Sequence, residues 1–414
     1  MSNSPFKNRV FGCAIIKSIT SNYNADFAHQ PRTLPNGTIY ATDKALKYTI
    51  RNYWQDFYEG EKVFFFKSVN EKLQPRTLDE RYLQLFEKFK TSITSDKFSV
   101  FEFDGEKVTG MIPEKPKSAQ VNKLFKELDE SSELQTFKKV FLTIAAKTAK
   151  IAKVDEVNIA PNENQDESYY FYLDNNGKVV KIEGEVSDVQ SIVSLVEEAM
   201  GGGVNRIEHL KDLLTCIDIR VFGATYAGKT NISIHGTCQI THGKDRLLES
   251  AKYTSQIMSP FRNPTEKSKD KMMTTLGSQT DLQEGHYVHH FSVNPKNIEG
   301  DAEAVKSDGL TKSDVDLFKQ ALRHGATYLD SSRKIGTENE LLLWVQLNEG
   351  SKAVLPSFVD LVIVNEEREI DLSKIKELLE KSHISSEVEK IELYYNFTTT
   401  KVINKPTSAI DFEL

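Results

Sequence analysis

One segment of the sequence matches a phosphate-binding loop. Residues 223–230, Gly-Ala-Thr-Tyr-Ala-Gly-Lys-Thr, fit the pattern GxxxxGK[ST], in which backbone amides and a lysine hold phosphate groups. Such a loop works because a helix follows it and points free N–H groups at the anion. Here Ile232 and Ile234 alternate with polar residues, which is the period of a strand. We expect strand, turn and strand, with a nucleotide hydrolase as an alternative.

The other residues able to do chemistry are scattered. His286 and His290 share one face of a predicted strand and His289 lies on the other face, without cysteine or acidic partners at metal-ligand spacing. Asp26 lies in a polar loop with no histidine or second carboxylate beside it in the sequence. It fits a turn former or, alternatively, a catalytic carboxylate. We expect no catalytic residue, no metal site and no cofactor.

Basic residues near the N-terminus are candidates for binding an anionic polymer. Lys44, Lys47 and Arg51 recur on one face of a predicted helix that Thr42 would cap. The opposite face is apolar: Leu46, Ile50, Tyr53, Trp54 and Phe57. A polar loop precedes the helix, residues 21–38 (the first loop), and it contains Asn24 and Arg32. This combination suits a phosphodiester backbone, although a solvated helix face is the ordinary alternative.

A second basic segment spans residues 244–283 and has little periodicity. A connection of this length in a compact domain is usually functional or disordered. Basic side chains interleaved with apolar ones suit a loop that lies over single-stranded nucleic acid and inserts between bases. The basic residues include Lys244, Arg246, Lys252 and Arg262, and the apolar ones Ile257, Met258 and Phe261.

Periodicity predicts a mixed α and β chain. The predicted strands are 9–19, 98–103, 169–182, 217–223, 230–240, 285–294, 340–347, 358–364 and 391–397. One predicted helix follows Thr42, which would cap it. The others span residues 78–94, 119–131, 133–153, 186–199, 204–215, 311–324 (with Thr311 as cap) and 371–382. We expect a core of residues 1–59 and 211–414, with an acidic, mainly helical insertion at 60–210.

The 414 residues carry a net charge of −7, which argues against an indiscriminate nucleic-acid binder. The charge is uneven, however: residues 219–273 hold 9 basic and 4 acidic side chains.

The sequence contains no apolar stretch long enough to span a bilayer and no secretory signal pattern. Three widely spaced cysteines suit a reducing compartment. We expect a cytoplasmic globular protein with a localised anion-binding face.

Two stretches resemble a known family. Residues 42–53 match T-D-x-x-L-K-x-x-I-R-x-Y after an Asn-rich loop and a Pro-Arg pair, and residues 218–243 contain D-I-R-V-F-G and T-C-Q-I-T-H-G. Weaker agreement continues through 285–294 and the helix start at 310–314. Together they resemble the backbone subunits of type I CRISPR Cascade complexes (the CRISPR-associated seven family), closest to the type I-B branch. The resemblance covers about half the chain.

The resemblance implies an α+β, RRM-like (ferredoxin-like) antiparallel core with an inserted domain and a long hairpin, the thumb, at 244–283. It implies subunits that stack head to tail on CRISPR RNA and leave bases free to pair with target DNA. Partners would be further copies and Cascade subunits of the CRISPR-associated five, six and eight families. The implied RNA-binding residues are Asn24, Arg32, Lys44, Lys47, Arg51, His242, Lys244, Arg246, Lys252 and Arg262, and the wedge is Ile257, Met258 or Phe261.

Related type III backbone subunits cut target RNA with an aspartate in a comparable loop. Asp26 therefore keeps a metal-dependent ribonuclease as an alternative to the non-cutting type I role. A purely structural assembly protein, which would oligomerise without RNA, is a third alternative. The acidic total charge and the long middle section depart from what the resemblance implies.

Overall fold

The computed structural model describes residues 4–69, 73–86, 102–103, 108–109, 138–145, 148–153, 167–173, 179–183, 206–228, 231–247, 249–259 and 275–414. The chain divides into two compact units. Unit 1 comprises residues 1–66, 214–224 and 234–414, and unit 2 comprises residues 67–213 and 225–233. Every described residue of the predicted RNA-binding set belongs to unit 1.

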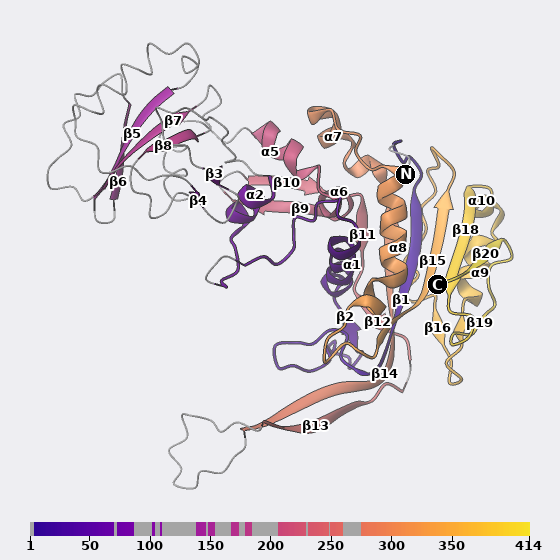
Figure 1. Cartoon of the computed structure of the whole chain (residues 1–414). Helices are drawn as coiled ribbons and strands as arrows, with labels where there is room; N and C mark the ends of the chain where they lie inside the picture. Colours follow the sequence, from indigo (N-terminus) through magenta and orange to yellow (C-terminus); the bar gives the residue numbers. More distant parts are fainter. Residues whose placement is uncertain are drawn as a thin grey trace, which may run out of the picture. The chain divides into compact units, whose positions relative to one another are not determined.

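The core of unit 1 is a large sheet with β1 (Val10–Ser21) inside it (Figure 1). β1 pairs antiparallel with β14 (Thr275–Val293) on one side and with β15 (Thr337–Leu347) on the other. The strand order is β2 (Tyr40–Ala41), β12 (Gly243–Asp245), β14, β1, β15, β18 (Val388–Tyr395) and β20 (Ala409–Glu413), while β11 (Cys238–Ile240) and β13 (Lys252–Ser259) also pair with β14. Consecutive residues of β1 are buried, so the sheet needs cover on both faces.

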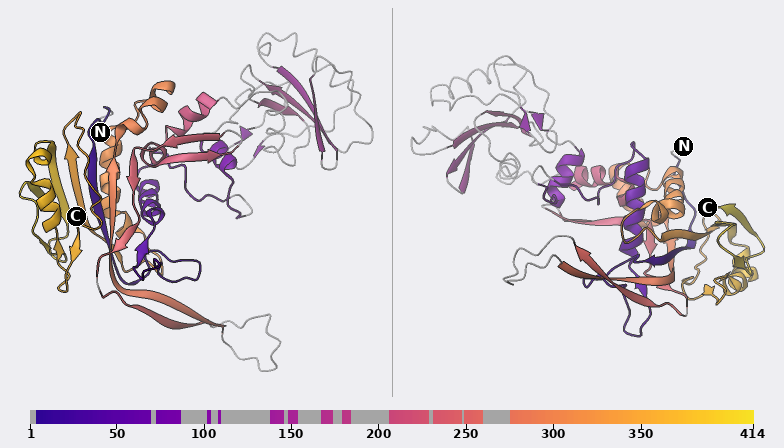
Figure 2. Two further views of the ribbon diagram at one scale, coloured as in Figure 1. Left: turned by 180° about the vertical axis from the view of Figure 1, so that it is seen from behind. Right: turned by 60° about the horizontal axis from the view of Figure 1, so that its bottom comes forward.

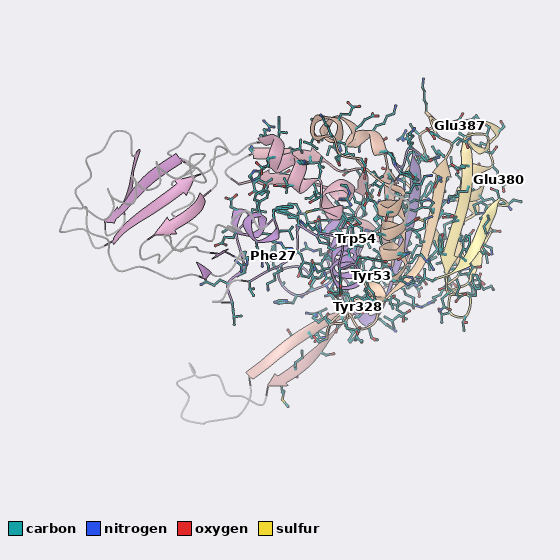
Figure 3. The ribbon with its side chains drawn as sticks, turned by 45° about the horizontal axis from the view of Figure 1, so that its top comes forward. Phe27, Tyr53, Trp54, Tyr328, Glu380 and Glu387 are labelled. Carbon is teal, nitrogen blue, oxygen red and sulfur yellow. The ribbon has the colours of Figure 1, made fainter. Side chains whose placement is uncertain are left out.

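Helices α1 (Asp43–Phe57) and α8 (Lys312–Tyr328) cover one face (Figure 1). The predicted apolar face of α1 is buried except Phe57, and Trp54 donates to the carbonyl of Leu317 (3.1 Å). Figure 3 labels Tyr53, Trp54 and Tyr328 on these helices. As predicted, Thr311 caps α8, in a capping box with Asp314. The 3-10 turn η2 (Pro295–Asn297) and α7 (Glu299–Val305) lead from β14 to α8.

The C-terminal part of unit 1 covers the other face (Figure 1). It contains α9 (Ser373–Leu379), α10 (Ser382–Ser385) and a small sheet of β16 (Ile363–Val364), β17 (Ile370–Asp371) and β19 (Val402–Ile403). Phe358 and Ile375 pack there against Cys13, Ile15 and Leu343. The predicted strand at 358–364 forms only at Ile363–Val364, in β16, and residues 359–361 form a turn. Phe358 and Val362 are nevertheless buried, so their burial does not require the pleat of a strand.

A two-stranded ribbon leaves this sheet (Figures 1 and 2). It consists of residues 252–259 in β13 and 275–282 in β14, paired from Lys252–Leu282 to Ser259–Thr275. These residues lie within the predicted thumb at 244–283, and from here on the name thumb means only this ribbon. Residues 251–258 are exposed. Because solvent reaches both faces of the ribbon, its sequence shows no alternation of apolar and polar residues. For this reason the predicted strand was placed at 285–294, whereas β14 begins ten residues earlier, at Thr275.

One predicted strand is wrong, because residues 217–222 form α6 (Ile217–Phe222). The β-branched residues favour a strand, but Ile217, Val221 and Phe222 are buried and Asp218 accepts backbone hydrogen bonds, so tertiary contacts override propensity. Gly223 ends the helix at φ +74°, where a Cβ would lie 2.4 Å from the carbonyl oxygen of Ile234.

Unit 2 contains α2 (Leu78–Phe86), α5 (Arg206–Leu213) and several strands. A four-stranded sheet has the order β6 (Thr148–Lys153), β5 (Lys138–Ala145), β7 (Glu167–Leu173), β8 (Val179–Glu183), and β3 (Glu102–Phe103) pairs with β4 (Val108–Thr109). The predicted helix at 133–153 is therefore wrong over β5 and β6. Val140, Leu142 and Ile144 recur at every second residue, the period of a strand. The predicted helices at 119–131 and 186–199 lie outside the described residues.

Candidate nucleic-acid interface

The first loop and the N-terminus of α1 are joined through Asn24. Its side-chain oxygen accepts hydrogen bonds from the backbone N–H (2.9 Å) and the hydroxyl (3.0 Å) of Thr42. Thr42 occupies the predicted N-cap position, but its own side chain does not cap the helix. Asn24 thus contributes to this surface by fixing the loop to the helix.

His242 meets the same helix end from the other side. Its Nδ1 accepts a hydrogen bond from the backbone N–H of Asp43 (3.2 Å), and its ring lies beside that of Tyr40 (centroids 5.7 Å apart). The imidazole remains 57% exposed. Residues from the first loop, β2 and the segment before β12 therefore gather at the start of α1.

The three basic residues of α1 do not have equivalent surroundings. Lys44 is exposed, and among the described residues the structure shows no ion pair for it. Lys47 pairs with Asp43 (3.1 Å) and lies over the ring of Phe222. Arg51 is largely buried, and its Nε donates to Asp218 (3.0 Å). Lys44 therefore has its charge available for a ligand, whereas Lys47 and Arg51 are engaged inside the protein.

Lys244 and Arg246 converge on one exposed carboxylate. Asp360 lies 3.3 Å from the ammonium of Lys244 and 3.2 Å from a guanidinium nitrogen of Arg246. Arg246 also donates to the carbonyl of Val362 (3.1 Å). Because Asp360 is 65% exposed, solvent screens these pairs and they are weak.

Lys252, at the base of the thumb, contacts the first loop. Its ammonium donates to the carbonyl of Pro31 (3.1 Å) and to the hydroxyl of Thr33. Arg32 lies between these two residues in the sequence, and its backbone carbonyl accepts a hydrogen bond from the backbone N–H of Tyr40 (3.0 Å). In the described part of the chain its guanidinium forms no ion pair. The structure thus brings the first loop, the start of α1 and the thumb base together through direct contacts.

The predicted wedge residues lie near the end of the described thumb. Ile257 is 46% and Met258 67% exposed. As neighbours on one strand they point to opposite sides of the ribbon. Gly277 faces Ile257 across the ribbon and adds no side chain. Phe261 and Arg262 lie outside the described residues.

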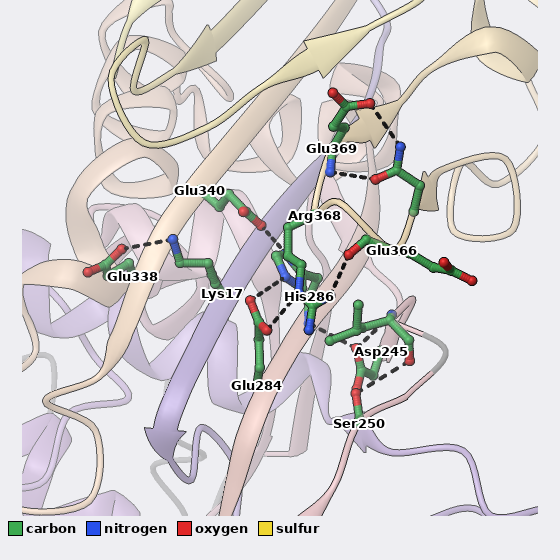
Figure 4. A network of polar contacts seen from close by, with 12 residues as sticks. Lys17, Asp245, Ser250, Glu284, His286, Glu338, Glu340, Glu366, Arg368 and Glu369 are labelled. Carbon is green, nitrogen blue, oxygen red and sulfur yellow. Dashed lines mark hydrogen bonds and ion pairs between the residues drawn. The ribbon is translucent and has the colours of Figure 1, made fainter.

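A buried polar network surrounds His286, in the part of β14 that follows the thumb, and it was not predicted (Figure 4). His286 is fully buried and its Nδ1 lies 2.6 Å from Glu340. Asp245, between Lys244 and Arg246 in the sequence, accepts the backbone N–H of His286 (2.8 Å). Arg368 pairs with Glu284 (3.0 Å). These residues are far apart in sequence, so no local pattern indicates the network. It fixes β12 to the strand that continues into the thumb.

The network predicts a pH-dependent stability. Burial alone would lower the pKa of His286, but the hydrogen bond and charge of Glu340, with Glu284 and Asp245 nearby, raise it above its ordinary 6.5. The protonated form therefore stabilises the fold fully below pH 6.5, and this stabilisation is lost as pH rises through the raised pKa. Urea unfolding should show a wild-type advantage over His286→Gln that shrinks from pH 6 to pH 8.

His289 provides a control of opposite sign. Burial lowers the pKa of its imidazole to about 4, so its folded form is neutral. The wild-type advantage over His289→Gln should grow as pH rises through 6.5. If both variants showed the same pH trend, the role assigned to Glu340 would be wrong.

The phosphate-loop match and Asp26 both lie in ordinary local structure. β9 (Gly223–Ala227) and β10 (Asn231–His235) pair with each other, so the phosphate-loop match leads into a strand, as predicted. The carboxylate of Asp26 accepts the backbone N–H of Gln30 (2.8 Å), as in a turn. No cluster of three His, Cys, Asp or Glu suited to a metal occurs in the described ranges. No helix described in either unit is long and apolar enough to cross a membrane.

Comparison with known proteins identifies the family. A chain of a CRISPR RNA-guided surveillance complex in a pre-nicking state is similar at 13% identity, covering 98% of this chain and 96% of that one, with a TM-score of 0.48. A second surveillance-complex chain has 12% identity, 66% and 96% coverage and a TM-score of 0.30. No curated protein matches. The family model described as CRISPR-associated protein Cas7 matches residues 8–384. The chain therefore belongs to the Cas7 family.

Proposed function

We propose that this chain is a CRISPR RNA-binding backbone subunit of a type I CRISPR interference complex. The observation that carries the proposal is the Cas7 family match, which spans residues 8–384 and so includes both units. The interface adds physical support, because polar and basic groups from three distant segments of the chain meet on one part of unit 1.

The RNA contacts that we propose are mainly to phosphates. Lys44 and Arg32 present positive charge for which the described residues show no ion pair. His242 is 57% exposed beside Asp43 and presents its other ring nitrogen, Nε2, as a donor. Lys244 and Arg246 would exchange Asp360 for a phosphate oxygen, because that carboxylate is exposed and weakly held. Phosphate contacts carry no sequence information, which suits a protein that accepts every guide sequence.

The thumb is proposed to insert Ile257 or Met258 beside the guide and displace single nucleotides. Exposed apolar side chains at the end of a ribbon are suited to entering between bases. The remaining bases would stay free to pair with target DNA. Copies would stack head to tail, because a heterologous contact that does not close produces an open helical filament. The partners proposed are copies of the chain and subunits of the CRISPR-associated five, six and eight families, in a complex of type I-B.

An RRM-like core fits the strand order around β1. The order β15, β1, β14, β12 with α1 and α8 on one face is that expected for two βαβ-type halves of a ferredoxin-like sheet. We propose that residues 1–59 and 211–414 form this core and that 60–210 is an insertion. The boundaries of the compact units after residues 66 and 213 lie close to this division and support it, while residues 225–233 of the proposed core belong to unit 2.

The purified full-length chain tests the proposal directly. We expect it to carry RNA, and to form filaments when mixed with a defined single-stranded RNA, as measured by sedimentation and electron microscopy. Filaments should dissociate as salt rises, because phosphate contacts release counterions. Filaments that form equally well without RNA would instead support a purely structural assembly protein.

We further propose that the subunit performs no chemistry and that Asp26 is a turn residue. Asp26→Ala should leave a complementary target RNA intact in the assembled complex with Mg²⁺, as in wild type, measured on denaturing gels over hours. The expected cost is the loss of one exposed turn hydrogen bond, about 0.5–1.5 kcal/mol of local stability. Periodic cuts in wild type that disappear in Asp26→Ala would establish the ribonuclease alternative.

A further inference from the structure

Arg333 lies in the connection between α8 and β15 and contacts two elements of the proposed interface. Its Nη2 donates to the carbonyl of His29 in the first loop (3.0 Å) and to the carbonyl of Thr280 in the thumb (2.6 Å). The same nitrogen pairs with the carboxylate of Asp281 (3.2 Å), which is buried. One guanidinium therefore joins the first loop to the thumb base.

Neighbouring contacts strengthen this junction. The carbonyl of Arg333 accepts the backbone N–H of Asn22 (2.9 Å), and the Asn22 side chain donates to Thr280 (3.3 Å). Lys334 donates to the carbonyl of Tyr23 (2.7 Å), and burial lowers the pKa of its ammonium to about 8. The connection thus contacts the beginning of the first loop as well as its middle.

We infer that Arg333 is a positioning residue that holds the first loop and the thumb base in one fixed arrangement before RNA binds. This inference rests on the proposed RNA-binding function. Nη2 is already shared among the carbonyls of His29 and Thr280 and the carboxylate of Asp281. The guanidinium also carries the donors of Nη1 and Nε, so the measurement that separates a positioning residue from a phosphate ligand is the salt dependence of binding. An interface that is already ordered loses less conformational entropy on binding, and its affinity is higher for that reason.

A positioning residue and a phosphate-binding residue differ in their salt dependence. Removing a phosphate contact lowers the slope of log affinity against log salt by about 0.7 for a single strand. Removing a residue that acts through others lowers affinity at an unchanged slope. The slope therefore distinguishes the two roles, and a purely structural role outside the interface would change neither quantity for the folded protein.

The experiment measures binding of a fluorescent mixed-sequence single-stranded RNA to the full chain over a range of KCl concentrations. Arg333→Ala should weaken binding about tenfold, the effect of losing hydrogen bonds made by a charged group, with the slope unchanged. Amide hydrogen exchange should accelerate in the first loop and in the thumb together. Asp281→Asn removes the ion pair but keeps both carbonyl contacts, and it should give a smaller change of the same kind.

Arg323→Ala is the matched control. Nη2 of Arg323 also donates to a backbone carbonyl, that of Glu413 (3.1 Å). Replacing Arg323 by alanine removes one positive charge, as Arg333→Ala does. It should leave RNA affinity and exchange in both segments unchanged. An unaltered affinity in Arg333→Ala, a slope reduced by about 0.7, or faster exchange in only one segment would overturn the inference. If wild type bound no RNA, the proposed function would fail, while hydrogen exchange would still test the junction itself.

Discussion

Replacing Arg32, Lys44, Lys244 and Arg246 together by alanine is expected to abolish most RNA binding. If each residue holds one phosphate, the slope of log affinity against log salt falls by about 3, and affinity near 0.1 M salt falls by more than about a hundredfold. Fluorescence anisotropy with a single-stranded RNA over a range of KCl concentrations measures both quantities.

The structure determines which residues belong in this variant. Lys47 and Arg51 are left unchanged, because their ion pairs with Asp43 and Asp218 contribute to the fold and their removal would confuse binding with stability. The control replaces four exposed lysines outside the interface, Lys296, Lys352, Lys374 and Lys381. It removes the same total charge and should change affinity only a few-fold. Equal losses in the two variants would show that net charge alone, and no localised surface, governs binding.

Asp218→Ala is expected to destabilise unit 1 by about 3–5 kcal/mol. The carboxylate is fully buried and accepts the backbone N–H groups of Phe64 (2.8 Å) and Phe65 (3.0 Å). It also pairs with Arg51, which would become an uncompensated, largely buried charge. Urea unfolding followed by tryptophan fluorescence measures the loss, because both tryptophans of the chain, Trp54 and Trp344, lie in this core.

Glu338→Ala provides the comparison for Asp218. Glu338 also pairs with a cation, Lys17 (3.6 Å), but its side chain is 52% exposed. Its removal should change the free energy of unfolding by less than about 1 kcal/mol, as for surface pairs in general. A loss below about 1 kcal/mol for Asp218→Ala would mean that water or another donor replaces the carboxylate, and that α6 is not fixed in place by it.

Elements with a long, regular periodicity and clearly marked ends were predictable from the sequence. β1 is a long apolar run, α1 has a repeating apolar face, and α8 begins with a capping box; each was predicted near its observed position. These signals are local, since a helix or strand repeats its burial within a few residues. The strand after the phosphate-loop match was predictable for the same reason.

The ion pairs of the basic residues could not be predicted from the sequence. Lys44 and Arg51 share a helix face and look equivalent in sequence, but only Arg51 meets Asp218, from a segment that comes much later in the chain. The contacts of Lys252 and Arg333 with the first loop likewise join distant segments. Local patterns specify period and polarity, whereas ion pairing depends on which segments folding brings within a few ångströms. Tertiary burial also made residues 217–222 a helix despite their strand-like composition.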